Sequence, residues 1–213
     1  YEEVPRDVMQ GYATIAAEVI EATEAAQQAA YTHVFLQGGV GGLAAGVVAY
    51  WWEHCGAARP KFIVVEPEQA DCLWQSAVHG QASMAQGSVD SIMAGLACGA
   101  TSPLAWRFLD SSVDAFMTVS DDEAITAMRQ LATGSEHDIP VLAGESGVAG
   151  LAALNQLAVD KAQMAALGLD EQARVLFISS EGATAPSVYA EAAGETAETV
   201  LARQQQWLNA QNT

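Results

Sequence analysis

The stretch that decides the fold is THVFLQGGVGGLAAG, residues 32–46. A β-type run from His33 to Leu36 leads into a glycine loop, Gln37 to Gly42, and an almost wholly apolar helix is predicted over residues 43–55. A second apolar strand, KFIVV, follows at residues 61–65. Strand, loop, helix and strand form a βαβ crossover, which implies a parallel sheet covered on both faces.

The segments on either side of this unit continue the alternation of helices and strands. Apolar residues at helical spacing predict a helix over about residues 8–29, and a polar terminal helix is predicted at about 191–209. Further helices are expected over residues 71–78, 103–109, 121–132 and 146–159, the last of them capped by Ser146, and further strands over residues 115–119 and 174–179. Because no repeat or low-complexity linker divides the chain, residues 1–213 are predicted to form one α/β domain with three layers and a mainly parallel twisted sheet.

The composition excludes two classes of partner. The chain has 213 residues, enough for a sizeable core, and its 8 basic against 26 acidic residues give a formal charge of −18. The basic residues are scattered singly, so the surface repels phosphate backbones and anionic lipid. We therefore expect neither a nucleic-acid partner nor a membrane partner.

The cysteines and the apolar runs bear on location. Cys55, Cys72 and Cys98 show no CxxC spacing and no histidines at metal-ligand intervals, so no metal site is predicted and a reducing compartment fits best. The apolar runs stop well short of the roughly 20 residues that a spanning helix needs, and no basic segment precedes an apolar stretch near Tyr1. A cytoplasmic location is expected.

The glycine loop is the strongest candidate for a binding site. Gly38, Gly39, Gly41 and Gly42, with Val40 between them, lie between a strand and a helix. Without Cβ atoms, their backbone N–H groups can converge on an anion at the start of the helix, which predicts a phosphate cradle. The alternative is a tight strand-to-helix turn with close packing.

A dinucleotide site is a second interpretation of the same loop. Gly39, Gly41 and Ala44 satisfy the G-x-G-x-x-G/A fingerprint, and Glu66 ends the following strand, where an acid that binds ribose would stand. Glu66 lies 66 − 39 = 27 residues beyond Gly39, more than the roughly 20 usual for this fingerprint. The loop alone leaves both interpretations open.

Four further segments carry a resemblance to a known family. They are SIMAGLACG at 91–99, SPLAW at 102–106, AGESGVAGLAAL at 143–154 and FISSEGATAPSVY at 177–189. In order and spacing they resemble the second half of the diaminopropionate ammonia-lyases, which are fold-type II pyridoxal-phosphate enzymes. VMQGYATIAAE, at 8–18, and VVEPEQADC, at 64–72, are similar to that family too, so the resemblance covers nearly the whole chain.

The resemblance implies a fold, a cofactor and an activity. The chain would be the large cofactor domain of a fold-type II enzyme, a homodimer that converts 2,3-diaminopropionate to pyruvate and ammonia with pyridoxal 5'-phosphate. The loop from Gly38 to Gly42 would hold the cofactor phosphate, Ser179 would hydrogen-bond the pyridine nitrogen, and Glu145 would line the cofactor cavity. A neutral hydroxyl at the ring nitrogen suits β-elimination rather than transamination.

The chain departs from the family pattern in two places. The family's Schiff-base lysine lies in its first half, and neither Lys61 nor Lys161 is placed to replace it, so no catalytic residue is assigned here. The chain is thus expected to be a fragment of a longer two-domain enzyme, with the missing amino-terminal half as a partner. In EGATA, at 181–185, Ala183 and Ala185 stand where the family usually carries aspartates.

Three other functions stay open at this point. A serine or threonine dehydratase-like lyase would share the motifs, and a nicotinamide-binding domain would share the glycine loop. A non-catalytic binding domain would have lost catalysis together with the first half.

Overall fold

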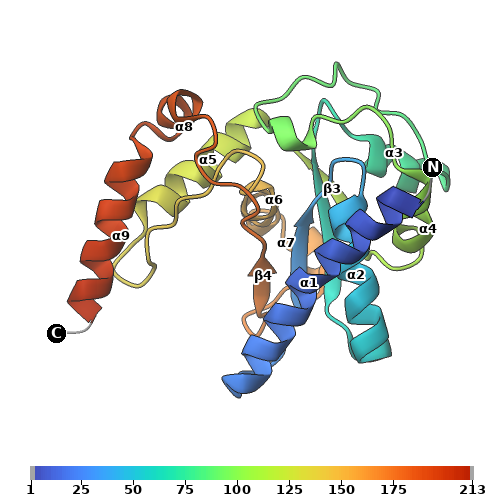
Figure 1. The fold of residues 1–213 in the computed structure, drawn as a ribbon, viewed down its shortest axis with the longest axis horizontal. Helices are drawn as coiled ribbons and strands as arrows, with labels where there is room; N and C mark the ends of the chain where they lie inside the picture. Colours follow the sequence, from blue (N-terminus) through green and yellow to red (C-terminus); the bar gives the residue numbers. More distant parts are fainter. Residues whose placement is uncertain (1–2, 212–213) are drawn as a thin grey trace.

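A four-stranded parallel sheet lies at the centre of the computed structural model, which describes residues 3–211 (Figure 1). The strands are β1 (His33–Gln37), β2 (Lys61–Pro67), β3 (Ala115–Val119) and β4 (Val175–Phe177). Their order is β3-β2-β1-β4, and each neighbouring pair is parallel. The predicted α/β class with a parallel sheet is confirmed.

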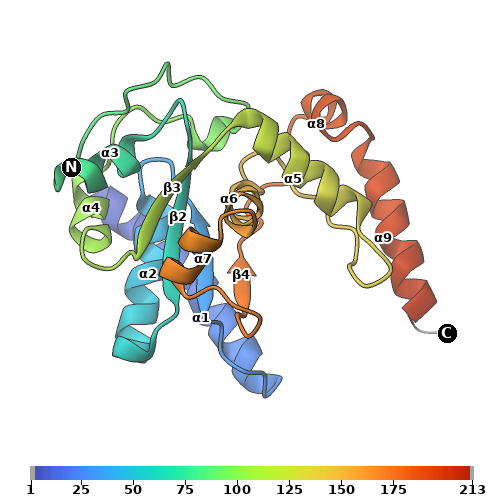
Figure 2. The same ribbon diagram turned by 180° about the vertical axis from the view of Figure 1, so that it is seen from behind.

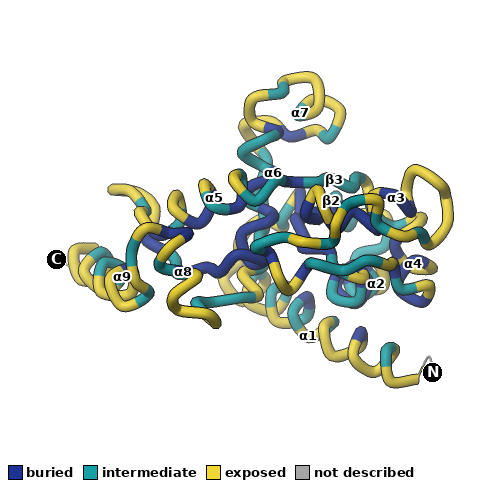
Figure 3. The backbone as a smooth tube through the Cα atoms, turned by 90° about the horizontal axis from the view of Figure 1, so that it is seen from above, coloured by how far each residue is buried: buried dark blue, intermediate teal, exposed yellow. Residues whose placement is uncertain are grey.

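Helices cover both faces of this sheet. They are α1 (Glu3–Ala25), α2 (Gly42–Cys55), α3 (Cys72–His79), α4 (Pro103–Leu109), α5 (Asp121–Thr133), α6 (Ala149–Ala158), α7 (Lys161–Leu167), α8 (Pro186–Ala193) and α9 (Ala197–Gln211), with short 3-10 turns η1 (Gly56–Ala58) and η2 (Ala94–Leu96). Seen from above, α1 and α7 lie on opposite sides of the sheet (Figure 3). Both ribbon views show α5, α8 and α9 extending away from the strands (Figures 1 and 2).

The two faces of the sheet bury two separate cores. Val34 and Leu36 of β1 pack in one core with α1, α2 and α4, whereas Phe35 packs in the other with α5, α6 and α8. This division follows from the alternation of side chains along a strand. Burial on both faces is the reason why the strand sequences are almost continuously apolar.

Local signals set the starts of two helices as expected. The Ser120 Oγ accepts from the Glu123 N–H at 3.3 Å, and the Glu123 carboxylate accepts from the Ser120 N–H at 2.7 Å, so a capping box opens α5. Ser102 caps α4, whose first residue is Pro103. Within the described residues, no helix combines the length and the apolar character needed to cross a membrane.

The ends of the chain differ from the prediction. The first helix begins at Glu3 and ends at Ala25 instead of covering 8–29. The predicted terminal helix at 191–209 is two helices, because Gly194 adopts a φ of +81° and ends α8 before α9 begins. The sequence did not predict α7, although Asp160 caps it and Gly168 ends it in the left-handed conformation.

Ser146 does not cap a helix as predicted. The helix begins only at Ala149, after a turn, and the residue before it is Val148, which makes no side-chain cap. The Ser146 Oγ instead accepts a hydrogen bond from the N–H of Gly95, 51 residues earlier in the chain. A tertiary contact thus replaces the local one.

Candidate functional site

A cavity of about 620 Å³ opens where β1 and β4 end, beside the glycine loop. Its lining consists of Val4, Pro5, Val8, Met9 and Tyr12 of α1; Gln37, Gly39, Val40, Gly41, Gly42 and Leu43; Gly95, Leu96, Cys98 and Ser102; and Ser146, Ser180, Glu181 and Thr184. We refer to it as the loop cavity. The carboxyl edge of a parallel sheet is the usual place for a ligand in open α/β folds.

The glycine loop lacks room for side chains. A Cβ on Gly38 would lie 2.8 Å from side-chain atoms of Leu73 and Val64, and one on Gly39 would lie 3.3 Å from the Gly95 oxygen. Gly41 adopts a φ of +97°, a left-handed conformation that favours glycine. Three of the four glycines therefore meet a steric requirement, whereas a Cβ on Gly42 would meet only Met9 Cγ, at 3.9 Å.

The same loop leaves backbone donors free at the start of a helix. Gly41 stands at the amino terminus of α2 and gives it no side-chain cap, so side chains do not take up the first N–H groups there. These donors, the positive end of the helix dipole and the absence of Cβ atoms together fit a phosphate group. Gly39, Val40, Gly41 and Gly42 line the loop cavity, and Gly38 lies beneath it against Leu73.

Two neighbouring serines follow β4. The Gln37 amide donates to the Ser180 Oγ and to the Ile178 oxygen, at 2.6 Å in each case, and Ser180 lines the loop cavity. Ser179, the residue predicted to contact a ring nitrogen, is exposed. Gln37 and Ser180 were not identified from the sequence, although Gln37 is a polar residue that directly separates the apolar residues 34–36 from the glycines.

Glu145 lies next to the loop cavity rather than on its wall. Its side chain is only 5% exposed, and its Oε1 has no hydrogen-bond partner among the described residues. The described residues that line the cavity include its neighbour Ser146 but not Glu145.

Glu66 occupies a structural position that does not suit a nucleotide. Its side chain is fully buried, and its two oxygens accept from the backbone N–H groups of Leu73 at 2.8 Å and Trp74 at 2.7 Å. Burial raises the pKa of Glu66 to about 8, against the lowering effect of these hydrogen bonds. A ribose hydroxyl would find both oxygens already engaged, so the geometry opposes the dinucleotide interpretation.

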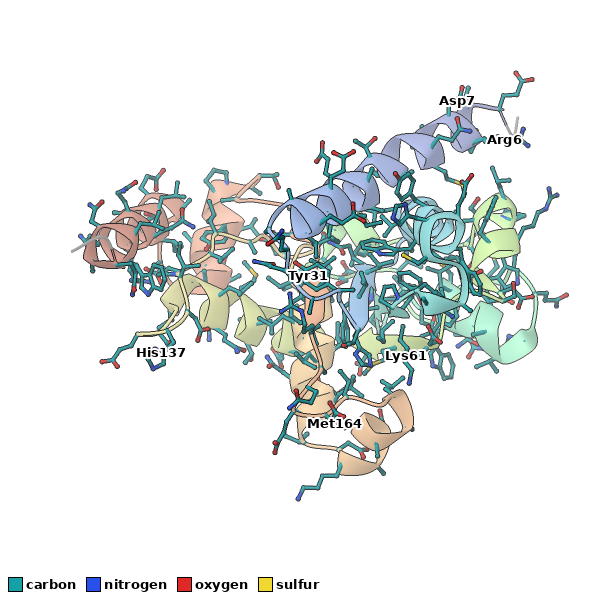
Figure 4. All side chains as sticks on the ribbon, turned by 90° about the horizontal axis from the view of Figure 1, so that it is seen from below. Arg6, Asp7, Tyr31, Lys61, His137 and Met164 are labelled. Carbon is teal, nitrogen blue, oxygen red and sulfur yellow. The ribbon has the colours of Figure 1, made fainter. Side chains whose placement is uncertain are left out.

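Both lysines are remote from the loop cavity. Lys61 opens β2 at the opposite end of the sheet, and its Nζ donates to the Leu167 oxygen at 2.6 Å. Figure 4 shows Lys61 beside the α7 segment, where Met164 is labelled. Lys161 is exposed in the first turn of α7. Neither lysine lines the cavity.

Comparison with known proteins gives one family match and several relatives. The family model described as "Pyridoxal-phosphate dependent enzyme" matches residues 4–181. The chain is 40% identical over 197 residues to the diaminopropionate ammonia-lyase of Salmonella typhimurium, a match that covers 89% of this chain and 48% of the relative. It is 38% identical over 198 residues to the Escherichia coli K12 enzyme of that name, with 92% and 50% covered.

Solved structures agree with these relatives. The Escherichia coli diaminopropionate ammonia-lyase in complex with an aminoacrylate-PLP azomethine reaction intermediate aligns with a TM-score of 0.78 and 37% identity, and the match covers 87% of this chain and 47% of that one. Maize serine racemase, at 23% identity and a TM-score of 0.66, shares the fold. The predicted resemblance is confirmed, and the chain spans about half the length of the curated relatives it matches.

Proposed function

The chain belongs to the family of pyridoxal-phosphate-dependent enzymes, and we propose that it works as half of a lyase that converts 2,3-diaminopropionate and water to pyruvate and two molecules of ammonia. The observation that carries this proposal is the 38–40% identity to diaminopropionate ammonia-lyases over about nine-tenths of the chain. The glycine loop and the loop cavity support it, because they offer a phosphate site beside an open volume.

The residues of this chain would bind and orient the cofactor. The backbone N–H groups from Gly39 to Gly42 would hold its phosphate at the amino terminus of α2. Gly38 would support the loop from below, because its own N–H already donates to the Val65 oxygen at 2.8 Å. The Ser179 hydroxyl would contact the ring nitrogen, and Ser180, held by Gln37, would fix the adjoining wall. Glu145 would support that wall from behind Ser146. The bound cofactor supplies the electron sink on which elimination depends.

The rest of the machinery would come from outside these residues. We assign the whole chain to a single α/β cofactor-binding domain, completed by an amino-terminal half that carries the lysine. A homodimer and a cytoplasmic location complete the proposal, which takes both from the family resemblance and the composition.

The deciding experiment uses the longer protein, loaded with pyridoxal phosphate. 2,3-Diaminopropionate is added, and pyruvate is followed by the lactate dehydrogenase-coupled loss of NADH. Pyruvate formation at a rate well above that of pyruvate from serine or of 2-oxobutyrate from threonine would support the proposal. Absence of both cofactor binding and pyruvate formation would remove it.

A dehydratase-like lyase is the second candidate, and one observation favours it. Ala183 packs against the core, and Ala185 stands uncapped before α8, in the loop where the family usually carries acids. Faster turnover of serine or threonine than of 2,3-diaminopropionate in the same assay would select this candidate.

A further inference from the structure

The walls of the loop cavity are joined in a closed ring of contacts. On one side, Gln37 at the end of β1 donates to the Ile178 oxygen and to the Ser180 Oγ, at 2.6 Å each. These bonds tie the residue before the glycine loop to the segment that follows β4. Ser180 then leads directly to Glu181, where the second side of the ring begins.

The second side runs from Glu181 back to the glycine loop. The Glu181 Oε2 accepts from the backbone N–H of Ser146 at 2.6 Å. The Ser146 Oγ accepts in turn from the N–H of Gly95 at 3.1 Å. The last step of the ring is close packing rather than a hydrogen bond: Gly95 lies against the glycine loop, where a Cβ placed on Gly39 would lie 3.3 Å from the Gly95 oxygen.

Close backbone packing leaves these segments little freedom to shift. A Cβ on Gly144 would lie 2.3 Å from the Gly182 oxygen, and the Gly144 N–H donates to the Glu181 oxygen at 2.8 Å. Ser146 is only 4% exposed. Removal of the acceptor for its N–H would leave a buried donor unsatisfied, which costs far more than loss of an exposed bond.

The Glu181 carboxylate is committed to the protein rather than offered to a ligand. It is the one carboxylate among the described residues that line the cavity. Its oxygens accept instead from the Ser146 N–H and, at 3.3 Å, from the Thr184 hydroxyl. The Glu181 side chain thus links the segment after β4 to the loop that contains Ser146.

We propose that Glu181 is a positioning residue for the cofactor: through Ser146 and Gly95 its carboxylate sets how the segment after β4 faces the glycine loop. This inference rests on the proposed function. Loss of the carboxylate would let the two walls move apart and would weaken contacts to phosphate and ring together.

The test measures cofactor binding in the longer protein, stripped of cofactor and titrated with pyridoxal phosphate. Glu181→Ala should weaken affinity by about tenfold and diminish the visible circular dichroism of the bound cofactor. Glu181→Gln keeps an oxygen for the Ser146 N–H and should stay within about threefold of the parent protein. Glu171→Ala, an exposed carboxylate in a turn, is the matched control and should leave affinity unchanged.

The outcomes separate this inference from the proposed function. Parent-like affinity and dichroism in Glu181→Ala would overturn the inference even if the melting temperature fell, because the role would then be structural alone. No binding by the parent protein would overturn the proposed function and the inference with it.

A double-mutant cycle provides a second test. Ser146→Ala removes the acceptor for Gly95 and should weaken cofactor affinity in the same direction as Glu181→Ala. If Glu181 and Ser146 act on the cofactor through the same chain of hydrogen bonds, the double variant will lose less cofactor affinity than the sum of the two single losses. Fully additive losses of affinity would contradict this coupling.

Discussion

Gly41 illustrates, at the scale of one residue, how sterics define the glycine loop. Its φ is +97°, and a Cβ there would lie 2.9 Å from Leu109 Cδ1, so Gly41→Ala should lower the free energy of unfolding by about 1–3 kcal/mol. Urea denaturation followed by far-ultraviolet circular dichroism measures the change. Gly11→Ala is the control: Gly11 is exposed within α1 with no atom near its missing Cβ, so stability should rise by about 0.5–1 kcal/mol. Equal effects at both sites would contradict the steric account.

The buried carboxyl of Glu66 is a second single residue with a testable effect, because it makes the stability of the fold depend on pH. Burial raises its pKa from 4.5 to about 8, so between these values the folded state holds a proton that the unfolded state has released. The stabilisation from this bound proton is fully present below the pKa that Glu66 has in the unfolded state. It is lost as the pH rises through the pKa of the folded state, and the free energy of unfolding then falls by at most about 1.4 kcal/mol per pH unit. Urea midpoints should therefore fall less steeply with pH in Glu66→Gln than in the parent. Glu171→Gln should keep the parent slope, and an unchanged slope in Glu66→Gln would disprove the assignment.

At the scale of elements, α8 has an uncapped amino terminus. Ala185 occupies the N-cap position and makes no side-chain hydrogen bond, and Pro186 follows it. Ala185→Asp would supply an acceptor and a favourable charge at the helix dipole, so the free energy of unfolding should rise by about 1 kcal/mol. The matched control is Asp160→Ala at α7, where the carboxylate already accepts from the Ala162 and Gln163 N–H groups, and stability should fall by about 1 kcal/mol. Thermal unfolding of both variants tests this: the melting temperature should rise in Ala185→Asp and fall in Asp160→Ala.

The helices also indicate which parts of the structure could be read from the sequence. The βαβ unit and the glycine loop were predictable because strand, turn and apolar helix are encoded within residues 32–65, whose local pattern agrees with the fold. Ser146 was misassigned because its hydroxyl has two possible uses, a local cap and a contact to Gly95, and only tertiary packing decides between them. Gln37 and Glu181 were missed as site residues for the same reason: their partners are 141 and 35 residues away.

At the scale of the whole molecule, both lysines of the chain lie away from the loop cavity. Lys61 is bonded to the Leu167 oxygen at the end of the sheet opposite the loop cavity, and Lys161 is exposed in α7. We expect borohydride reduction of the longer, cofactor-loaded protein to attach the cofactor to a lysine outside residues 1–213. Peptide mass mapping locates the adduct. Lys161→Arg should leave the yield unchanged, and an adduct on Lys61 or Lys161 would contradict the expectation.

The strand order has a consequence for the time at which the site forms. β4 lies beside β1, yet Thr32 and Arg174, which bond at the start of this pairing, are 142 residues apart. On the ribosome, β1, α2 and β2 emerge before β4 and can pair while synthesis continues, whereas Ser180 and Glu181 follow about 140 residues after the glycine loop. Contacts this distant in sequence also form slowly. From the emergence of α2 until the segment after β4 is made, a nascent chain therefore carries an open glycine loop with one wall still untranslated.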